Sequence, residues 1–112
     1  MHEFLTLAAG ARKRRFRADI RAGEYILVET GRRGGRMRLS WSDYKKMIAF
    51  FRNKGFFPLG NGTGGVKAGG LGEYFQSQLK KSPRYASHFA ALMVHLKDAK
   101  VVSVRPIALR IL

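Results

Sequence analysis

The chain has 112 residues, of which 46% are hydrophobic, which is enough for one domain with an apolar core. Its 22 Lys and Arg against 7 Asp and Glu give a formal net charge of +15, so a polyanion is the expected partner, and nucleic acid is the commonest polyanion. The absence of cysteine excludes disulfides, thiolate metal ligands and cysteine nucleophiles.

Two further absences in the sequence bear on where the protein acts. No apolar run approaches the ~18 residues of a membrane-spanning helix. The first residues, MHEFLTLAAGA, place an acid rather than a base before a short apolar run, unlike a signal peptide. We therefore expect no membrane partner and a cytoplasmic, nucleoid-associated protein.

The first third of the chain predicts a short helix and then three strands. Residues 3–9 suit a helix that ends at Gly10. Residues 15–21 and 36–40 alternate apolar and polar side chains, and residues 24–30 are rich in β-forming residues bounded by glycine. These three segments predict an antiparallel meander with one buried and one cationic face.

A helix is predicted over residues 41–54, with Ser40 or Ser42 as its N-cap and Gly55 after its end. Its apolar side chains recur at helical spacing, and the apolar segment that follows is expected to plug the core. The residues expected to be buried here are Tyr44, Met47, Ile48, Phe51, Phe56, Phe57 and Pro58.

A glycine-rich segment at 58–70 separates this helix from the rest. It lacks the Gly-Lys-Ser/Thr ending of a P-loop, which argues against a nucleotide triphosphatase. Either it closes over a bound strand or it is a spacer, and both interpretations stand. A helical pair at 71–97 follows, and strands at 101–112 are expected to complete the sheet.

The expected fold class is therefore α+β, an antiparallel β-sheet of a three-strand meander plus C-terminal strands, packed against three or four helices. In chain order the single domain, 1–112, comprises a β-meander at 14–40, a helix at 41–54, a glycine-rich loop at 58–70, a helical pair at 71–97 and strands at 101–112.

The second helix of the pair starts at Ser82-Pro83, a cap followed by proline in the first turn. Its buried stripe is expected to contain Tyr85, Phe89, Leu92, Met93 and Leu96, and its opposite face Arg84, Ser87, His88, Ala91 and His95. In an alternative interpretation, the pair and the strands after it form a winged helix. The protein would then be a transcriptional regulator that binds duplex DNA, and Arg84, Ser87 and His88 would contact bases.

The cationic strand face is the strongest functional signal, because open arginines contact phosphates and can stack on bases, and Asp19 is the only acid expected among them. Single strands are also held by stacking on aromatic rings. The aromatic candidates are Tyr25, Trp41, Tyr44, Phe57, Tyr74 and Tyr85, each of which is individually a better candidate for the core. The expected nucleic-acid contacts are Arg12, Lys13, Arg14, Arg15, Arg17, Arg21, Tyr25, Arg32, Arg33, Arg36, Arg38, Trp41, Lys45, Arg84 and His88.

Catalysis has little support. His2, His88 and His95 have no spaced acid partner, and His88 and His95 are two helical turns apart, too far to chelate one metal easily. We expect no enzyme activity, catalytic residue, metal or cofactor. A third alternative is a basic adaptor that docks a ribonucleoprotein or an acidic partner. Separately, the apolar strand EYILVET leaves room for an edge at which a homodimer could form.

The segment RFRADIRAGEYILVETGRRGGRMRLSWSDYKKMIAFF resembles the sheet-plus-helix unit of Whirly- and Pur-type single-strand binders. It is also similar to ThermoDBP-type single-stranded-DNA-binding proteins of hyperthermophilic archaea, over residues 14–57. Few Asn and Gln, no Cys and abundant Arg would suit a thermophile. Residues 60–97 depart from this pattern and resemble a winged helix.

The resemblance implies a cationic sheet or cleft with exposed aromatics that holds single-stranded DNA with little sequence preference. We therefore expect single-stranded nucleic acid as the partner and favour DNA over RNA, while duplex DNA and RNA stay open as alternatives. Carried onto this chain, it places Tyr25 or Trp41 under bases. The residues that it places on the nucleic-acid backbone are Arg15, Arg17, Arg21, Arg36 and Arg38.

Overall fold

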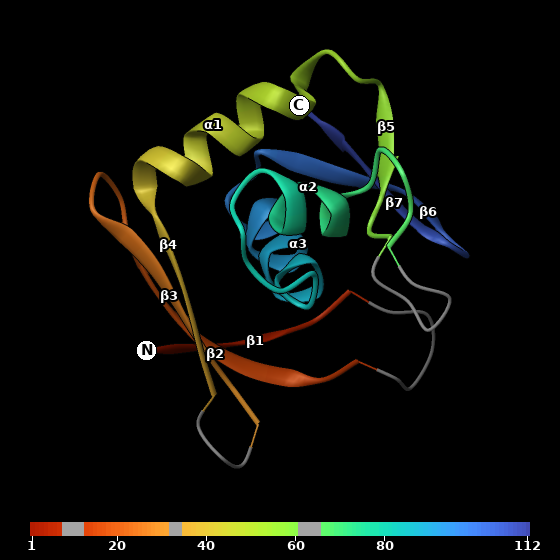
Figure 1. Cartoon of the computed structure of the whole chain (residues 1–112). Helices are drawn as coiled ribbons and strands as arrows, with labels where there is room; N and C mark the ends of the chain where they lie inside the picture. The colour runs from red at the N-terminus through yellow and green to blue at the C-terminus, as the bar shows by residue number, and fades with distance from the viewer. Residues whose placement is uncertain (8–12, 32–34, 61–65) are drawn as a thin grey trace.

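A computed structural model of the chain describes residues 1–7, 13–31, 35–60 and 66–112. Among these residues the fold is α+β, as the sequence predicts, with seven strands in two antiparallel sheets and three helices (Figure 1). The elements are β1 (His2–Leu5), β2 (Arg15–Arg21), β3 (Tyr25–Thr30), β4 (Gly35–Ser40), α1 (Trp41–Arg52), β5 (Phe56–Pro58), α2 (Leu71–Ser77), α3 (Tyr85–His95), β6 (Ala99–Val104) and β7 (Ile107–Ile111).

The first sheet is a meander with the order β1-β2-β3-β4. Its three predicted strands are present, and Phe16, Ala18 and Leu39 are buried on its inner face. β3 is hydrogen-bonded to a neighbour on both sides, so the EYILVET strand offers no free edge to a second copy of the chain.

The helix expected at 3–9 is wrong where the structure describes it. His2–Leu5 is a strand that pairs antiparallel with β2, and Phe4 lies opposite Phe16 with ring centroids 5.6 Å apart. So short a helix is marginal by itself, whereas the strand satisfies its backbone on β2 and packs Phe4 over the core. Residues 8–10 of the expected helix lie outside the described residues.

Helix α1 agrees with the prediction in its cap and in its buried stripe. Ser40, not Ser42, is the N-cap: its Oγ accepts a hydrogen bond of 3.1 Å from the backbone N–H of Asp43. Gly55, with φ +72°, follows the end of the helix, where only glycine adopts that conformation readily. Beyond it Phe57 is buried, but Phe56 is 73% exposed, so the expectation that both plug the core is wrong for Phe56.

The C-terminal strands do not complete the first sheet, contrary to the prediction. They form a second sheet in the order β5-β7-β6, in which β5 pairs with β7. The three residues FFP alternate outward, inward and outward as a strand, and this supplies the C-terminal hairpin with a nearer partner than the meander.

Helix α3 lies between the two sheets in the middle of the molecule (Figure 1). The start predicted at Ser82-Pro83 is wrong by two residues: α3 begins at Tyr85, and its N-cap, Arg84, makes no side-chain cap hydrogen bond. The Ser82 Oγ accepts the N–H of Arg84 at 3.2 Å in the turn before the helix. Phe89, Leu92 and Met93 are buried as predicted, whereas Tyr85 and Leu96, expected in the same stripe, are only half-buried. Ala91, expected on the exposed face, is buried as well, because the meander covers that side of the helix.

In the described part of the chain, no helix has the length and apolar character needed to cross a bilayer.

Candidate nucleic-acid interface

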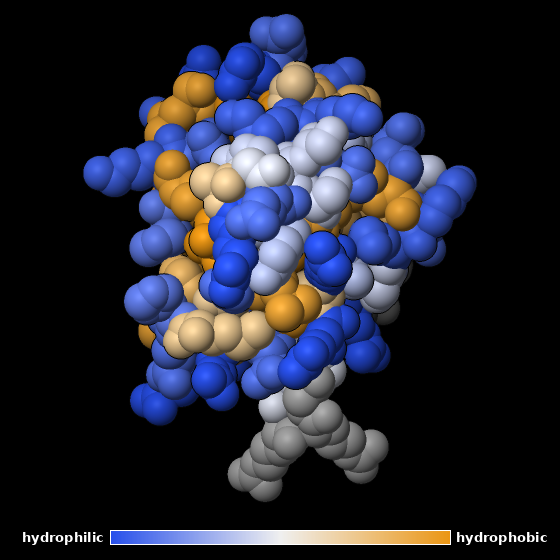
Figure 2. Space-filling view, turned by 90° about the vertical axis from the view of Figure 1, so that its left-hand side faces the viewer, coloured by the Kyte–Doolittle hydropathy of each residue, from blue (hydrophilic) through white to orange (hydrophobic). Residues whose placement is uncertain are grey.

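The exposed face of the meander carries the arginines that the sequence assigned to it. Side chains alternate along each strand, so the register of β1 to β4 decides which residues share this surface, here called the outer sheet face. Figure 2 shows the side of the molecule that lies to the left in Figure 1, and it is largely hydrophilic with apolar residues scattered among the charged ones. The outer sheet face consists of Glu3, Leu5, Arg15, Arg17, Asp19, Arg21, Tyr25, Leu27, Glu29, Arg36, Arg38 and Ser40.

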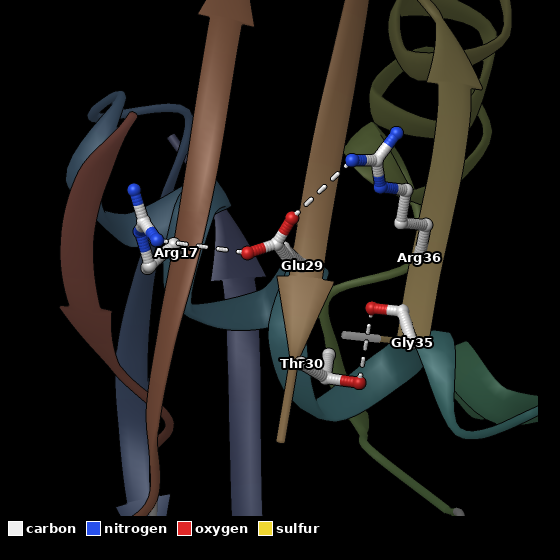
Figure 3. A network of polar contacts seen from close by, with 5 residues as sticks. All are labelled: Arg17, Glu29, Thr30, Gly35 and Arg36. Carbon is white, nitrogen blue, oxygen red and sulfur yellow. Dashed lines mark hydrogen bonds and ion pairs between the residues drawn. The ribbon is translucent and has the colours of Figure 1, made fainter. Parts of the chain in front are cut away.

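The outer sheet face contains more acid than the sequence analysis expected. Glu29, on β3, lies between two arginines of the neighbouring strands, 3.7 Å from Arg17 and 3.6 Å from Arg36 (Figure 3). Glu3 lies 3.9 Å from Arg15 on the added strand β1. The prediction that Asp19 is the only acid here is therefore wrong, because strand register and β1 bring in two further carboxylates.

These ion pairs bind the arginines only weakly. The side chains of Arg15, Arg17, Arg21 and Arg36 are all more than half exposed. Exposed pairs contribute little net free energy and are screened by salt. A phosphate can therefore compete with the carboxylates for these guanidinium groups, at the cost of leaving Glu29 or Asp19 close to the incoming anion.

Tyr25 is the aromatic ring of the outer sheet face and is half-buried. The guanidinium carbon of Arg38 lies 4.7 Å from the centroid of this ring, and that of Arg21 lies 5.8 Å away. Among the described residues, Arg38 is the one arginine of this face without a carboxylate within 4 Å, whereas Arg21 pairs with Asp19 at 3.0 Å. Tyr25 and Arg38 thus form an outward-facing cation–π pair with its charge available.

Trp41 begins α1 at the edge of this face. Its ring is half-buried and stacks on Tyr44 with centroids 5.2 Å apart, and its backbone N–H donates to the carbonyl of Glu24 at 3.1 Å. Of the other aromatic candidates, Tyr44 and Phe57 are fully buried, Tyr74 is nearly so, and Tyr85 is half-buried against Phe89. Tyr25 and Trp41 are therefore the candidates with the most accessible position beside the basic surface.

The remaining predicted contacts are scattered. Lys13 and Arg14 are exposed just before β2, Lys45 is exposed on α1, and Arg84 is exposed at the start of α3. His88, in contrast, packs edge-on against Phe16 with ring centroids 5.0 Å apart. The predicted residues Arg12, Arg32 and Arg33 lie outside the described residues.

Burial lowers the pKa of His88 below its ordinary value of 6.5, partly opposed by the contact of its Nδ1 with the Arg84 carbonyl at 3.4 Å. The neutral ring is therefore the favoured form inside the fold. His88 thus packs on the meander and Ala91 is buried, whereas Arg84 and His95, on the same side of α3, are exposed.

The exposed side of α1 carries a second set of cations, Lys45, Lys46, Arg52 and Lys54, counting the lysine just after the helix. All the ion pairs of the described residues lie on the outer sheet face, so none involves these four. The Nζ of Lys54 instead lies 4.9 Å from the centroid of the Phe50 ring.

Two exposed phenylalanines near the end of α1 were missed by the sequence analysis. Phe50 is 43% exposed and Phe56 is 73% exposed. Both line a cleft of about 350 Å³ between the end of α1, β5 and α2. Two signals could have found them: Phe50 lies outside the predicted apolar stripe of its helix, and Phe56 alternates with the buried Phe57.

Within the described residues, no three His, Cys, Asp or Glu side chains gather in a way that could hold a metal ion. Comparisons with protein-family models, with curated proteins and with solved structures give no match for this chain. What the molecule offers chemically is a set of exposed cations beside accessible aromatic rings, on an α+β scaffold.

Proposed function

We propose that this protein binds single-stranded nucleic acid, DNA in preference to RNA, with little sequence specificity and without catalysis. The observation that carries the proposal is the pair formed by Tyr25 and Arg38, an outward-facing aromatic ring with an unneutralised guanidinium 4.7 Å from its centroid. A ring of this kind stacks on a base and the guanidinium meets the adjoining phosphate.

The charge supports a polyanionic partner. A net charge of +15 on 112 residues opposes the compact state unless counter-ions or a polyanion neutralise it. The cations of α1, which have no carboxylate partner in the described structure, provide phosphate contacts that need not displace an ion pair. Contacts to phosphate carry no sequence information, which fits a tolerant binder.

Single strands are favoured over duplexes for a structural reason. Groove readout needs a helix whose outer face is free to enter the major groove. The α3 face proposed for that role holds His88 against Phe16 and buries Ala91. Base stacking on aromatic rings instead requires unpaired bases. A cytoplasmic, nucleoid-associated location would follow from DNA as the partner.

The proposal is tested with labelled single-stranded DNA, duplex DNA and RNA of one sequence, by fluorescence anisotropy at two salt concentrations. Binding should be tightest for the single-stranded DNA, with a log–log salt slope of about −0.7 per phosphate contact. Quenching of Trp41, the only tryptophan, would place it in or near the site. Duplex DNA binding as tightly as the single strand at equal salt would overturn the proposal.

A further inference from the structure

We infer that the cleft lined by Phe50, Lys54 and Phe56 accepts one unpaired nucleobase of a bound single strand. The inference rests on the proposed function and adds a second, separate base-binding position to it. The cleft lies between the end of α1, β5 and the start of α2.

Two aromatic rings are exposed to solvent at the cleft. Phe56 is 73% exposed and Phe50 is 43% exposed, although the fold buries Phe51 and Phe57 right beside them. Phe51 and Phe57 stack on each other with centroids 4.1 Å apart, and both also line the cleft. Two apolar rings thus remain in solvent beside a buried pair of phenylalanines. This arrangement suits stacking of a planar, uncharged group.

The cleft is lined by a cation, Lys54, which can meet a phosphate, and by a carboxylate, Glu73, which can meet an N–H of a base. The Nζ of Lys54 lies 4.9 Å from the Phe50 centroid, where it can meet a phosphate next to a stacked base. Glu73, on α2, also lines the cleft, and its Oε1 accepts the N–H of Gly69 at 3.1 Å, which holds the carboxylate in place. Its remaining lone pairs can accept an N–H from the edge of the base, and every nucleobase carries such a donor.

Gly69 and Gly70 form one wall of the cleft. Gly69 has φ +77°, and a Cβ on Gly70 would lie 3.2 Å from the carbonyl oxygens of both Lys67 and Pro58. Glycine therefore lets this backbone lie close against β5, and it leaves a wall without side chains. The resulting volume of about 350 Å³ is at the small end for ligand sites, which suits one base rather than a larger ligand.

The position of the cleft also suits a strand that contacts the outer sheet face. Helix α1 begins at Trp41, next to that face, and its 12 residues span about 18 Å toward the cleft. Exposed Lys45 and Lys46 lie along the way. A single strand can therefore stack at Tyr25, follow the lysines of α1 and place a further base at Phe50 and Phe56.

The test uses the full chain and single-stranded DNA with 5-iododeoxyuridine distributed along it, which crosslinks under light to aromatic rings that stack on it. Mass spectrometry should find the crosslinks on Phe50 or Phe56 as well as on the outer sheet face. In anisotropy, Phe56→Leu should weaken binding by about fivefold or more, because a leucine keeps the apolar surface and loses the stacking ring.

Val104→Ala is the matched control, since it removes an exposed apolar side chain that does not line the cleft, and it should leave binding unchanged. Thermal unfolding of both variants should stay close to that of the parent, because both side chains are more than half exposed. If the parent binds single strands but Phe56→Leu binds equally well and no crosslink maps to the cleft, the cleft inference is overturned while the proposed function stands. If the parent binds no oligonucleotide, both are overturned.

Discussion

His88 of α3 packs edge-on against Phe16 of β2, with ring centroids 5.0 Å apart. A second contact of the same kind joins His95 to Phe4 of β1, at 4.9 Å. Through these contacts the meander packs on the side of α3 that helical periodicity predicts to be exposed, although Arg84 and His95 on that side remain exposed. The candidate residues with the most open side chains therefore lie on the outside of the sheet and of α1.

The burial of His88 predicts a fold that weakens in mild acid. Burial holds the pKa of His88 below 6.5 in the folded chain, while the unfolded chain keeps the ordinary value, so the unfolded state takes up the proton first. The neutral ring makes its full contribution to the free energy of unfolding above the ordinary pKa of 6.5. This contribution is lost as the pH falls through the lower pKa that His88 has in the folded chain. The midpoint temperature of thermal unfolding should decrease as the pH is lowered from about 8 to about 5, and it should decrease less in His88→Leu. The exposed His2→Gln is the control; equal slopes in all three proteins would contradict this assignment.

Arg36 and Arg38 lie two residues apart on β4 and should differ in their contribution to binding. Arg36 shares Glu29 with Arg17, whereas Arg38 has no carboxylate within 4 Å in the described part of the chain and lies over Tyr25. Each alanine variant removes one positive charge. Arg38→Ala should flatten the log–log salt slope for single-stranded DNA by about 0.7, the value of one phosphate contact, and Arg36→Ala by less. Equal changes in slope would show that only net charge matters.

Removal of the Glu29 charge should strengthen binding. Glu29 lies within 4 Å of both Arg17 and Arg36, and its side chain is 25% exposed (Figure 3). Glu29→Gln keeps the size of the side chain and frees both guanidinium groups for phosphate. Affinity for single-stranded DNA should rise, and the salt slope should steepen by up to about 1.4, two phosphate contacts. Glu24→Gln, at an exposed turn position, tests for the effect of net charge alone; a gain of the same size there would count against release of the two arginines.

The hydroxyl of Tyr44 connects α1 to the turn between α3 and β6. It donates to Oδ2 of Asp98 at 2.6 Å, and burial together with this bond raises the pKa of Tyr44 above its ordinary value, so the phenol stays protonated. Tyr44→Phe should lower the free energy of unfolding by about 1.5–3 kcal/mol, as expected for a hydrogen bond to a charged acceptor. Urea unfolding measures this change in the free energy of unfolding, provided that the m-value stays the same in the variant. Tyr85→Phe, at a half-buried ring, should change it less.

Local patterns in the sequence predicted most of the elements. RFRADIR alternates apolar and polar side chains, and the structure buries Phe16 and Ala18 and exposes the arginines. The stripe from Tyr44 to Phe51 and the cap at Ser40 define α1 in the same way. In these cases the residues that decide the structure are neighbours in the chain, so periodicity and capping are sufficient.

The errors come from contacts between distant residues. HEFL is too short to reveal a strand, and only its pairing with β2 makes it one. The place of Glu29 among the arginines depends on register, and FFP becomes β5 only through β7. The sequence YASHFAALMVH has an apolar residue, Ala91, on the side predicted to be exposed, which is typical of a helix that is covered on more than one side.

If unpaired bases stack on this basic surface, the protein distinguishes a single strand from a duplex, and a competition experiment measures that difference. A labelled single-stranded DNA bound to the protein is displaced either by the same unlabelled strand or by that strand annealed to its complement, at equal salt and equal strand concentration. The unlabelled single strand should compete at much lower concentration than the duplex, and Tyr25→Leu should reduce the difference. Equal competition by the two, unchanged in Tyr25→Leu, would mean that the surface recognises phosphates alone and would contradict the account.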